Sequence, residues 1–124
     1  MPGSFIAVAS GSIGSLTVSH AFILTPQLMQ ATGSNSQADA APIVTPAAVV
    51  VTVSTSSRGV RLPAAVSGLT EMVHNGTSTF VRVFPAPGDR IGANATNDSI
   101  GLEPGKGGIF FAQDATTWRV ILGA

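Results

Sequence analysis

Residues 48–54 read Ala-Val-Val-Val-Thr-Val-Ser, and this run of β-branched side chains is the strongest indication of the fold. Val49, Val50, Val51 and Val53 favour a strand, because branching at Cβ suits a pleated sheet better than a helix. A nearly continuous apolar run is typical of a strand that is covered on both faces. Either this is the central strand of the core, or a second subunit covers one of its faces.

Shorter runs of similar composition follow along the chain, separated by turn residues. We expect strands over residues 16–24, 48–54, 71–74, 79–84, 108–112 and 117–122. In the last of these, Trp118 shares one face with other apolar residues, which places it in the core. Asn75-Gly76 predicts a β-hairpin, and Thr25-Pro26 indicates a short helix over residues 25–31. The sequence therefore predicts an all-β protein, a small β-sandwich or barrel.

Charged side chains make up only 10% of the 124 residues, and the six basic and six acidic groups cancel. A sparsely charged surface with zero net charge favours association. The single lysine argues against nucleic acid as a partner, since phosphate binding needs clustered basic groups. The most apolar stretch, residues 40–53, is broken by Pro42 and Pro46 and is shorter than the ~20 residues of a membrane span. We therefore expect neither a nucleic-acid nor a membrane partner.

The charges also divide the chain into two parts. Asp39 is the only charged residue before Arg58, and all others follow with mixed sign, like the solvent face of a folded domain. Residues 30–46 are rich in Ala, Ser, Thr, Gly and Pro, which is typical of a loop or linker. We expect an N-terminal arm with its linker over residues 1–46 and a folded body over residues 47–124.

No group of residues forms a convincing chemical site. The chain has no cysteine, and its two histidines, His20 and His74, are far apart in sequence, whereas zinc needs three or four converging ligands. Residues 101–107 (GLEPGKG) lack the spacing and the Ser or Thr of a phosphate loop and predict a β-turn. A sugar-active enzyme would need a pair of carboxylates in a cleft. We predict no catalytic residues, no metal, no cofactor and no enzymatic activity.

Several segments of the chain resemble a small β module of tailed-bacteriophage virion proteins. They are the run at residues 49–53, followed by GVRLPAAVSG (59–68), VHNG (73–76), VRVFPAPGDRI (81–91), IGLEPG (100–105), IFF (109–111) and the late Trp118. The same kind of domain is found in capsid decoration (cement) proteins, head fibres and tail-associated proteins. The resemblance thus implies a structural virion component.

The resemblance also implies partners and a location. Decoration modules often form homotrimers on the exterior of the capsid, bound to the major capsid protein, and their N-terminal segments often run as arms over neighbouring subunits. Because the apolar run at residues 49–53 can be covered by a second subunit, Val49, Val50, Val51 and Val53 are candidate interface residues, together with Phe22 and Leu24 of the expected 16–24 strand. The alternative is a tail-tip or fibre-associated protein that binds host surface glycans.

Overall fold

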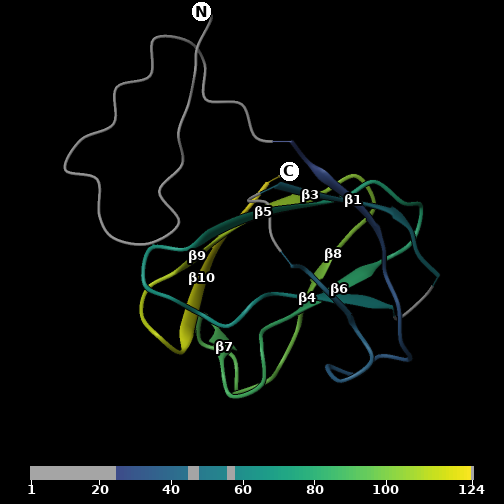
Figure 1. Cartoon of the computed structure of the whole chain (residues 1–124). Helices are drawn as coiled ribbons and strands as arrows, with labels where there is room; N and C mark the ends of the chain where they lie inside the picture. The colour runs from purple at the N-terminus through teal and green to yellow at the C-terminus, as the bar shows by residue number, and fades with distance from the viewer. Residues whose placement is uncertain (1–24, 45–47, 56–57, 124) are drawn as a thin grey trace, which may run out of the picture.

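The computed structural model describes residues 25–44, 48–55 and 58–123. Within these ranges all regular structure is β-strand, and no helix is present (Figure 1). The all-β class expected from the sequence is therefore confirmed for the described part of the chain. The strands, in chain order, are β1 (Gln27–Gln30), β2 (Ala41–Pro42), β3 (Ala48–Val53), β4 (Gly59–Arg61), β5 (Thr70–Asn75), β6 (Val81–Phe84), β7 (Arg90–Ile91), β8 (Ile100–Leu102), β9 (Gly107–Ala112) and β10 (Thr117–Leu122).

These strands form two hydrogen-bonded sheets. The six-stranded sheet, sheet A, has the order β1-β3-β5-β9-β10-β7, and the four-stranded sheet, sheet B, has the order β2-β4-β6-β8. From β1 to β6 the chain alternates between the sheets. β3 pairs in parallel with both β1 and β5 in sheet A, and β4 pairs in parallel with both β2 and β6 in sheet B. One strand in each sheet makes up a coil, so β1–β2, β3–β4 and β5–β6 are three stacked coils. This winding is that of a short β-solenoid.

The expected sandwich or barrel is therefore wrong. Such folds are built mainly from antiparallel strands joined by hairpins, whereas this chain returns to each sheet only after passing through the other. The hairpin predicted at Asn75-Gly76 is wrong for the same reason, since β5 lies in sheet A and β6 in sheet B. Alternation within a strand indicates which side chains face inward, but it does not specify which strand lies alongside.

Asn75, the last residue of β5, stabilises the connection that leads from sheet A to sheet B. Its buried side-chain Nδ2 donates hydrogen bonds to the carbonyl oxygens of Thr79 at 2.7 Å and Leu102 at 2.9 Å. Its Oδ1 accepts one from the backbone N–H of Thr77 at 2.9 Å. The amide group thus satisfies backbone groups of the turn at Thr77 and Thr79 and also binds the turn to Leu102 of β8; bonding of local backbone groups is a common role of asparagine.

Among the strands after the third coil, β8, β9 and β10 add antiparallel pairs, whereas β7 pairs in parallel with β10. β9 lies between β5 and β10 and is antiparallel to both, and β8 is antiparallel to β6. In the β9–β10 turn, Oδ1 of Asp114 accepts hydrogen bonds from the backbone N–H groups of Thr116 and Thr117 at 2.9 and 2.8 Å. The bond from Thr116 contributes most to holding the pKa of Asp114 below its ordinary value.

The core fills the space between the two sheets. Sheet A contributes Val49, Val51, Val73, Phe110 and Trp118, and sheet B contributes Val60, Val81, Val83 and Leu102. Trp118 has no exposed surface, so the expectation that it is a core residue is confirmed. The inner faces of the two sheets are therefore covered by one shared apolar cluster.

Residues 27–43 belong to the same two sheets. The short helix predicted over residues 25–31 is wrong, because β1 pairs with β3 there. The segment interpreted as a linker is also more ordered than expected: it contains β2 and contributes Ala31 and Ile43 to the core. Pro42 is compatible with β2 because this strand lies at the edge of sheet B. The expected boundary at residues 46 and 47 and the expected 16–24 strand lie outside the described residues.

Candidate interaction surface

The side of sheet A that faces away from the core is unusually apolar. Strand register aligns Leu28, Val50 and His74 with Gly107 in one row across the sheet. The next row contains Ala48, Met72, Ile109 and Ile121, and a third contains Thr70, Phe111 and Arg119. These three rows define the outer face of sheet A, a name kept below.

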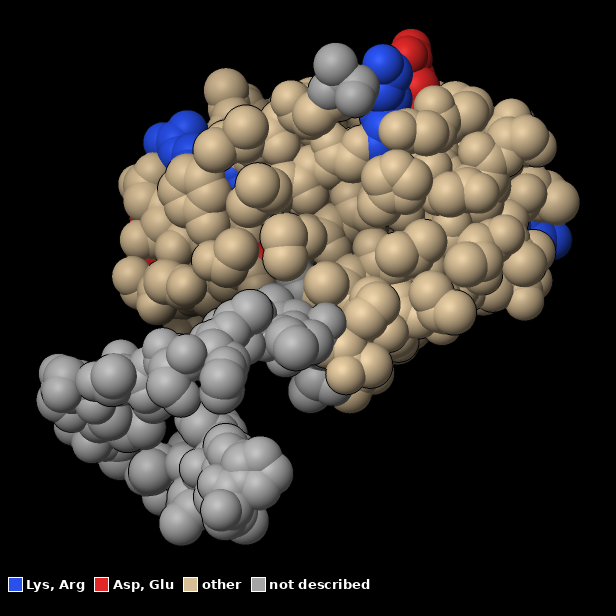
Figure 2. Space-filling model, turned by 90° about the horizontal axis from the view of Figure 1, so that it is seen from above, with Lys and Arg blue, Asp and Glu red and all other residues tan. Residues whose placement is uncertain are grey.

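The large side chains of this face remain open to solvent. Leu28 is 68% exposed, Ile121 61% and Ile109 43%. Single exposed apolar residues are ordinary, but a contiguous group of them marks an interaction surface. Figure 2 shows the molecule from above the view of Figure 1, the side on which β1, β3 and β5 lie. Most of the visible surface there is uncharged, and most of the charged atoms lie toward its edge.

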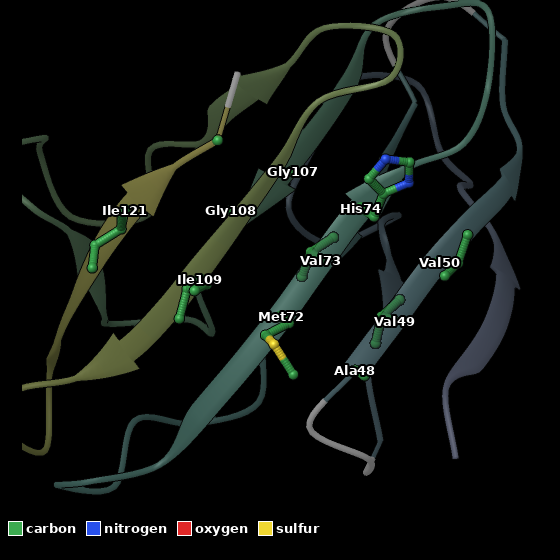
Figure 3. Close-up of a pocket in the computed structure, with 11 residues that line it drawn as sticks. Ala48, Val49, Val50, Met72, Val73, His74, Gly107, Gly108, Ile109 and Ile121 are labelled. Carbon is green, nitrogen blue, oxygen red and sulfur yellow. The ribbon is translucent and has the colours of Figure 1, made fainter. Parts of the chain in front are cut away.

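A hollow of about 350 Å³ lies on the outer face between β3, β5, β9 and β10 (Figure 3). Gly107 and Gly123 leave its floor without side chains, while Val50, His74 and Ile109 are among the side chains that line it. A Cβ atom added at Gly123 would meet only the carbonyl oxygen of Gly107, at 3.6 Å, so the space above Gly123 is open. The hollow can accommodate an apolar side chain from a partner.

The interface residues predicted from the sequence do not all lie on the outer face of sheet A. Val49 and Val51 point into the core, whereas Val50 lines the hollow and Val53 is exposed at the end of β3. The strand is thus covered on its inner face by sheet B and open on its outer face. Phe22 and Leu24 lie outside the described residues. The assignment of these side chains to an interface between subunits stays a prediction.

Met72, Ile109, Phe111 and Ile121 belong to the same face but were not predicted for it. The available signal was that β9 and β10 have apolar side chains on both faces. In β9, Phe110 and Ala112 face the core while Ile109 and Phe111 face outward. A strand of this kind in a sheet with only one covered face indicates a second contact surface.

Glu71 is the one carboxylate buried without a full set of partners in the described part of the chain. It lies on the core side of β5, is 3% exposed, and its Oε2 accepts no hydrogen bond there. Burial away from water raises the pKa of Glu71 to about 7. Buried Asp89, in contrast, accepts a hydrogen bond from the backbone N–H of Ala65 at 2.9 Å.

The turn predicted near Pro104-Gly105 is confirmed, since Lys106 donates its backbone N–H to the carbonyl of Glu103 at 3.0 Å and Gly105 has a φ of 76°. Among the described residues, no three His, Asp or Glu side chains gather where they could hold a metal ion. The described strands and loops include no helix with the length and apolar character needed to cross a membrane.

Comparison of the chain with protein-family models, with curated proteins and with solved structures found no match. The function is therefore inferred from the residues and from the surface that they form.

Proposed function

We propose that this protein is a structural virion component that assembles as a homotrimer and binds the exterior of a tailed-phage capsid, which it stabilises without catalysing a reaction. The observation that supports this most is the outer face of sheet A. It combines exposed Leu28, Ile109 and Ile121 with a hollow lined almost entirely by apolar groups. A surface of this composition gains free energy when it is buried against another protein.

The hollow favours a closed ring of copies. In a cyclic trimer each interface joins two different patches of the subunit surface, and a hollow on one copy that takes up a protruding side chain of its neighbour meets this requirement. The hollow on sheet A is the concave element, and exposed apolar side chains elsewhere in the chain can fill it. Burial gives ~25 cal/mol per Å² of apolar surface, and part of this is lost to the ordering of the two partners.

The capsid is the second partner in this proposal, and the support for it is the resemblance to virion modules together with the low charge of the chain. A decoration protein works mechanically, because each copy bridges several capsid subunits. Many weak contacts then add up over the shell. The major capsid protein is the proposed binding partner, and no cofactor is required.

The proposal is tested with particles that lack the protein. Purified chain is added to bare capsids, which are then sedimented and heated. We expect co-sedimentation that persists in about 1 M NaCl, because apolar contacts are not screened as ion pairs are. Decorated particles should release their genome at a higher temperature than bare ones. Equal heat resistance would contradict a stabilising function.

A second candidate function, glycan binding by a tail-associated protein, is favoured by one observation. Phe80 is 40% exposed and borders a hollow of about 320 Å³ that is also lined by Glu103 and Lys106. The guanidinium carbon of Arg82 lies 5.7 Å from the centroid of the Phe80 ring. An exposed ring beside polar groups is the kind of surface on which a sugar can stack. Titration with host-surface glycans, for the wild type and for Phe80→Ala, distinguishes this function from capsid binding.

A further inference from the structure

The inner side of β10 is covered unevenly, because sheet A extends further than sheet B at this end of the molecule. Beyond β5, sheet A continues with β9, β10 and β7, whereas beyond β6 sheet B continues with β8 alone. Trp118 is fully buried and Val120 partly buried, but Leu122, the next residue on the same side of β10, is 57% exposed. No described strand of sheet B therefore covers the end of β10.

The edge of β8 that faces away from β6 carries an unpaired peptide group. Gly101 of β8 lies opposite Arg82 of β6. Arg82 donates its backbone N–H to the carbonyl oxygen of Arg58 at 3.0 Å, so its backbone groups point toward β4 and away from β8. Opposite residues of an antiparallel pair either bond to each other through both backbone groups or not at all. Gly101 therefore directs its N–H and C=O to the free edge of β8, where no described residue bonds to them.

A hollow of about 320 Å³ lies between this free edge and the uncovered end of β10. Gly101 lines it from β8 and Leu122 from β10, and the ring of Phe80 borders it. A Cβ atom added at Gly101 would overlap the Phe80 ring, so the ring lies directly on this glycine. Glu103 and Lys106 also line the hollow, and their opposite charges favour an uncharged occupant. The hollow thus combines apolar side chains with a free backbone edge, and a β-strand can satisfy both.

We propose that this hollow is the docking site for an extended, uncharged segment of a different protein, which adds to sheet B beside β8. The backbone of the segment pairs with the N–H and C=O of Gly101, and its inward apolar side chains cover Leu122. The unpaired peptide group distinguishes this occupant from the sugar of the second candidate function, which has no backbone to pair with it. Leu122 faces the opposite side of β10 from Ile121, so the site is distinct from the outer face of sheet A and does not depend on the proposed trimer.

The probe for this site is the peptide acetyl-Gly-Val-Thr-Val-Gly-amide, in which two apolar side chains flank one polar residue. Two analogues each carry one N-methyl group, either on the threonine or on the second valine. Neighbouring N–H groups of a strand point to opposite edges, so only one of the two methyl groups can block pairing with β8. In a titration followed by the amide NMR signal of Gly101, one analogue should bind at least about tenfold more weakly than the parent peptide, and the other should bind like it.

Two variants locate the site. Leu122→Asp places a charge in the hollow at an exposed position, and should weaken peptide binding by at least about tenfold while self-association is retained. Ile109→Asp, on the outer face of sheet A, is the matched control and should bind the peptide like the wild type whatever its oligomeric state.

Four outcomes would overturn the proposal. The first is an unchanged Gly101 signal with the parent peptide in large excess, and the second is equal affinity of the two analogues. The third is loss of self-association in Leu122→Asp, which would assign the hollow to a contact between copies. The fourth is a Gly101 signal that responds to host-surface glycans but not to the peptide, which would assign the hollow to the second candidate function.

Discussion

Gly123 donates its backbone N–H to the carbonyl oxygen of Gly107 at 2.8 Å, so two residues without side chains lie next to each other on the outer face of sheet A. Both glycines line the hollow. A side chain at Gly123 would extend into open space, whereas a Cβ atom at Gly107 would lie 3.0 Å from the carbonyl oxygen of Val73. The shape of the proposed interface thus depends on two glycines at the start of β9 and after the end of β10.

Replacing Gly123 by a larger residue should fill the hollow and weaken self-association without lowering the stability of the fold. The space above this residue is open, so Gly123→Leu places an apolar side chain where a partner's side chain would insert. We expect the association constant to fall by at least about tenfold, with a smaller loss for Gly123→Ala. Analytical ultracentrifugation measures the association, and thermal melting checks the fold.

Ser78→Leu is the control for this prediction, because Ser78 is exposed in the connection between β5 and β6 and does not line the hollow. It should associate like the wild type. If Gly123→Leu also associates like the wild type, the hollow is not part of the interface.

Truncation of Trp118 should destabilise the protein severely. Trp118 is fully buried in the cluster shared by the two sheets, and Trp118→Ala leaves a cavity that costs about 3–5 kcal/mol of unfolding free energy. Urea unfolding followed by circular dichroism measures this. Phe80→Ala, at a half-exposed ring, should cost less. A Trp118→Ala variant that unfolds like the wild type would contradict the assignment of Trp118 to the core.

The stability of the protein should fall as the pH rises from about 4.5 to 7. Burial raises the pKa of Glu71 from 4.5 to about 7, so in this range the folded state binds more protons than the unfolded state. The loss is on the order of 3 kcal/mol and levels off at about pH 8, where Glu71 is ionised almost completely in both states.

Glu71→Gln keeps the shape of the side chain and removes its charge. This variant should be more stable than the wild type at pH 8 and about equal at pH 4, as measured by thermal melting across the pH range. Glu103→Gln, at an exposed turn residue, serves as the control and should retain the wild-type pH profile. A Glu71→Gln profile that falls as steeply as the wild-type profile would assign the pH dependence to other groups.

The longer strands could be predicted from the sequence because their alternation is local. The predicted ranges 48–54, 71–74, 79–84, 108–112 and 117–122 coincide closely with β3, β5, β6, β9 and β10. The shorter β1, β2, β4, β7 and β8 were not predicted, since they depend on pairing with distant strands. Thr25-Pro26 illustrates this: it resembles the start of a helix, but pairing with β3 makes the following residues a strand.

The solenoid winding and the outer face could not be predicted for a related reason. The pattern of β3 indicates two apolar faces but not what covers each of them. Only the register with β5 and β9 shows that Val50, Met72 and Ile109 share one exposed surface. The alternatives of core strand and interface strand were both reasonable, since Val49 and Val51 face the core while Val50 faces the hollow.

The oligomeric state of the full chain and of one surface variant tests the central claim most directly. Native mass measurement at micromolar concentration should give three copies for the wild type. Ile109→Asp places a charge in the middle of the outer face and should give a monomer, because an unpaired charge is costly to bury. Val66→Asp, at an exposed apolar residue between β4 and β5, should remain trimeric. A monomeric wild type, or an Ile109→Asp variant that still forms trimers, would contradict the assignment of the outer face of sheet A as the interface between copies.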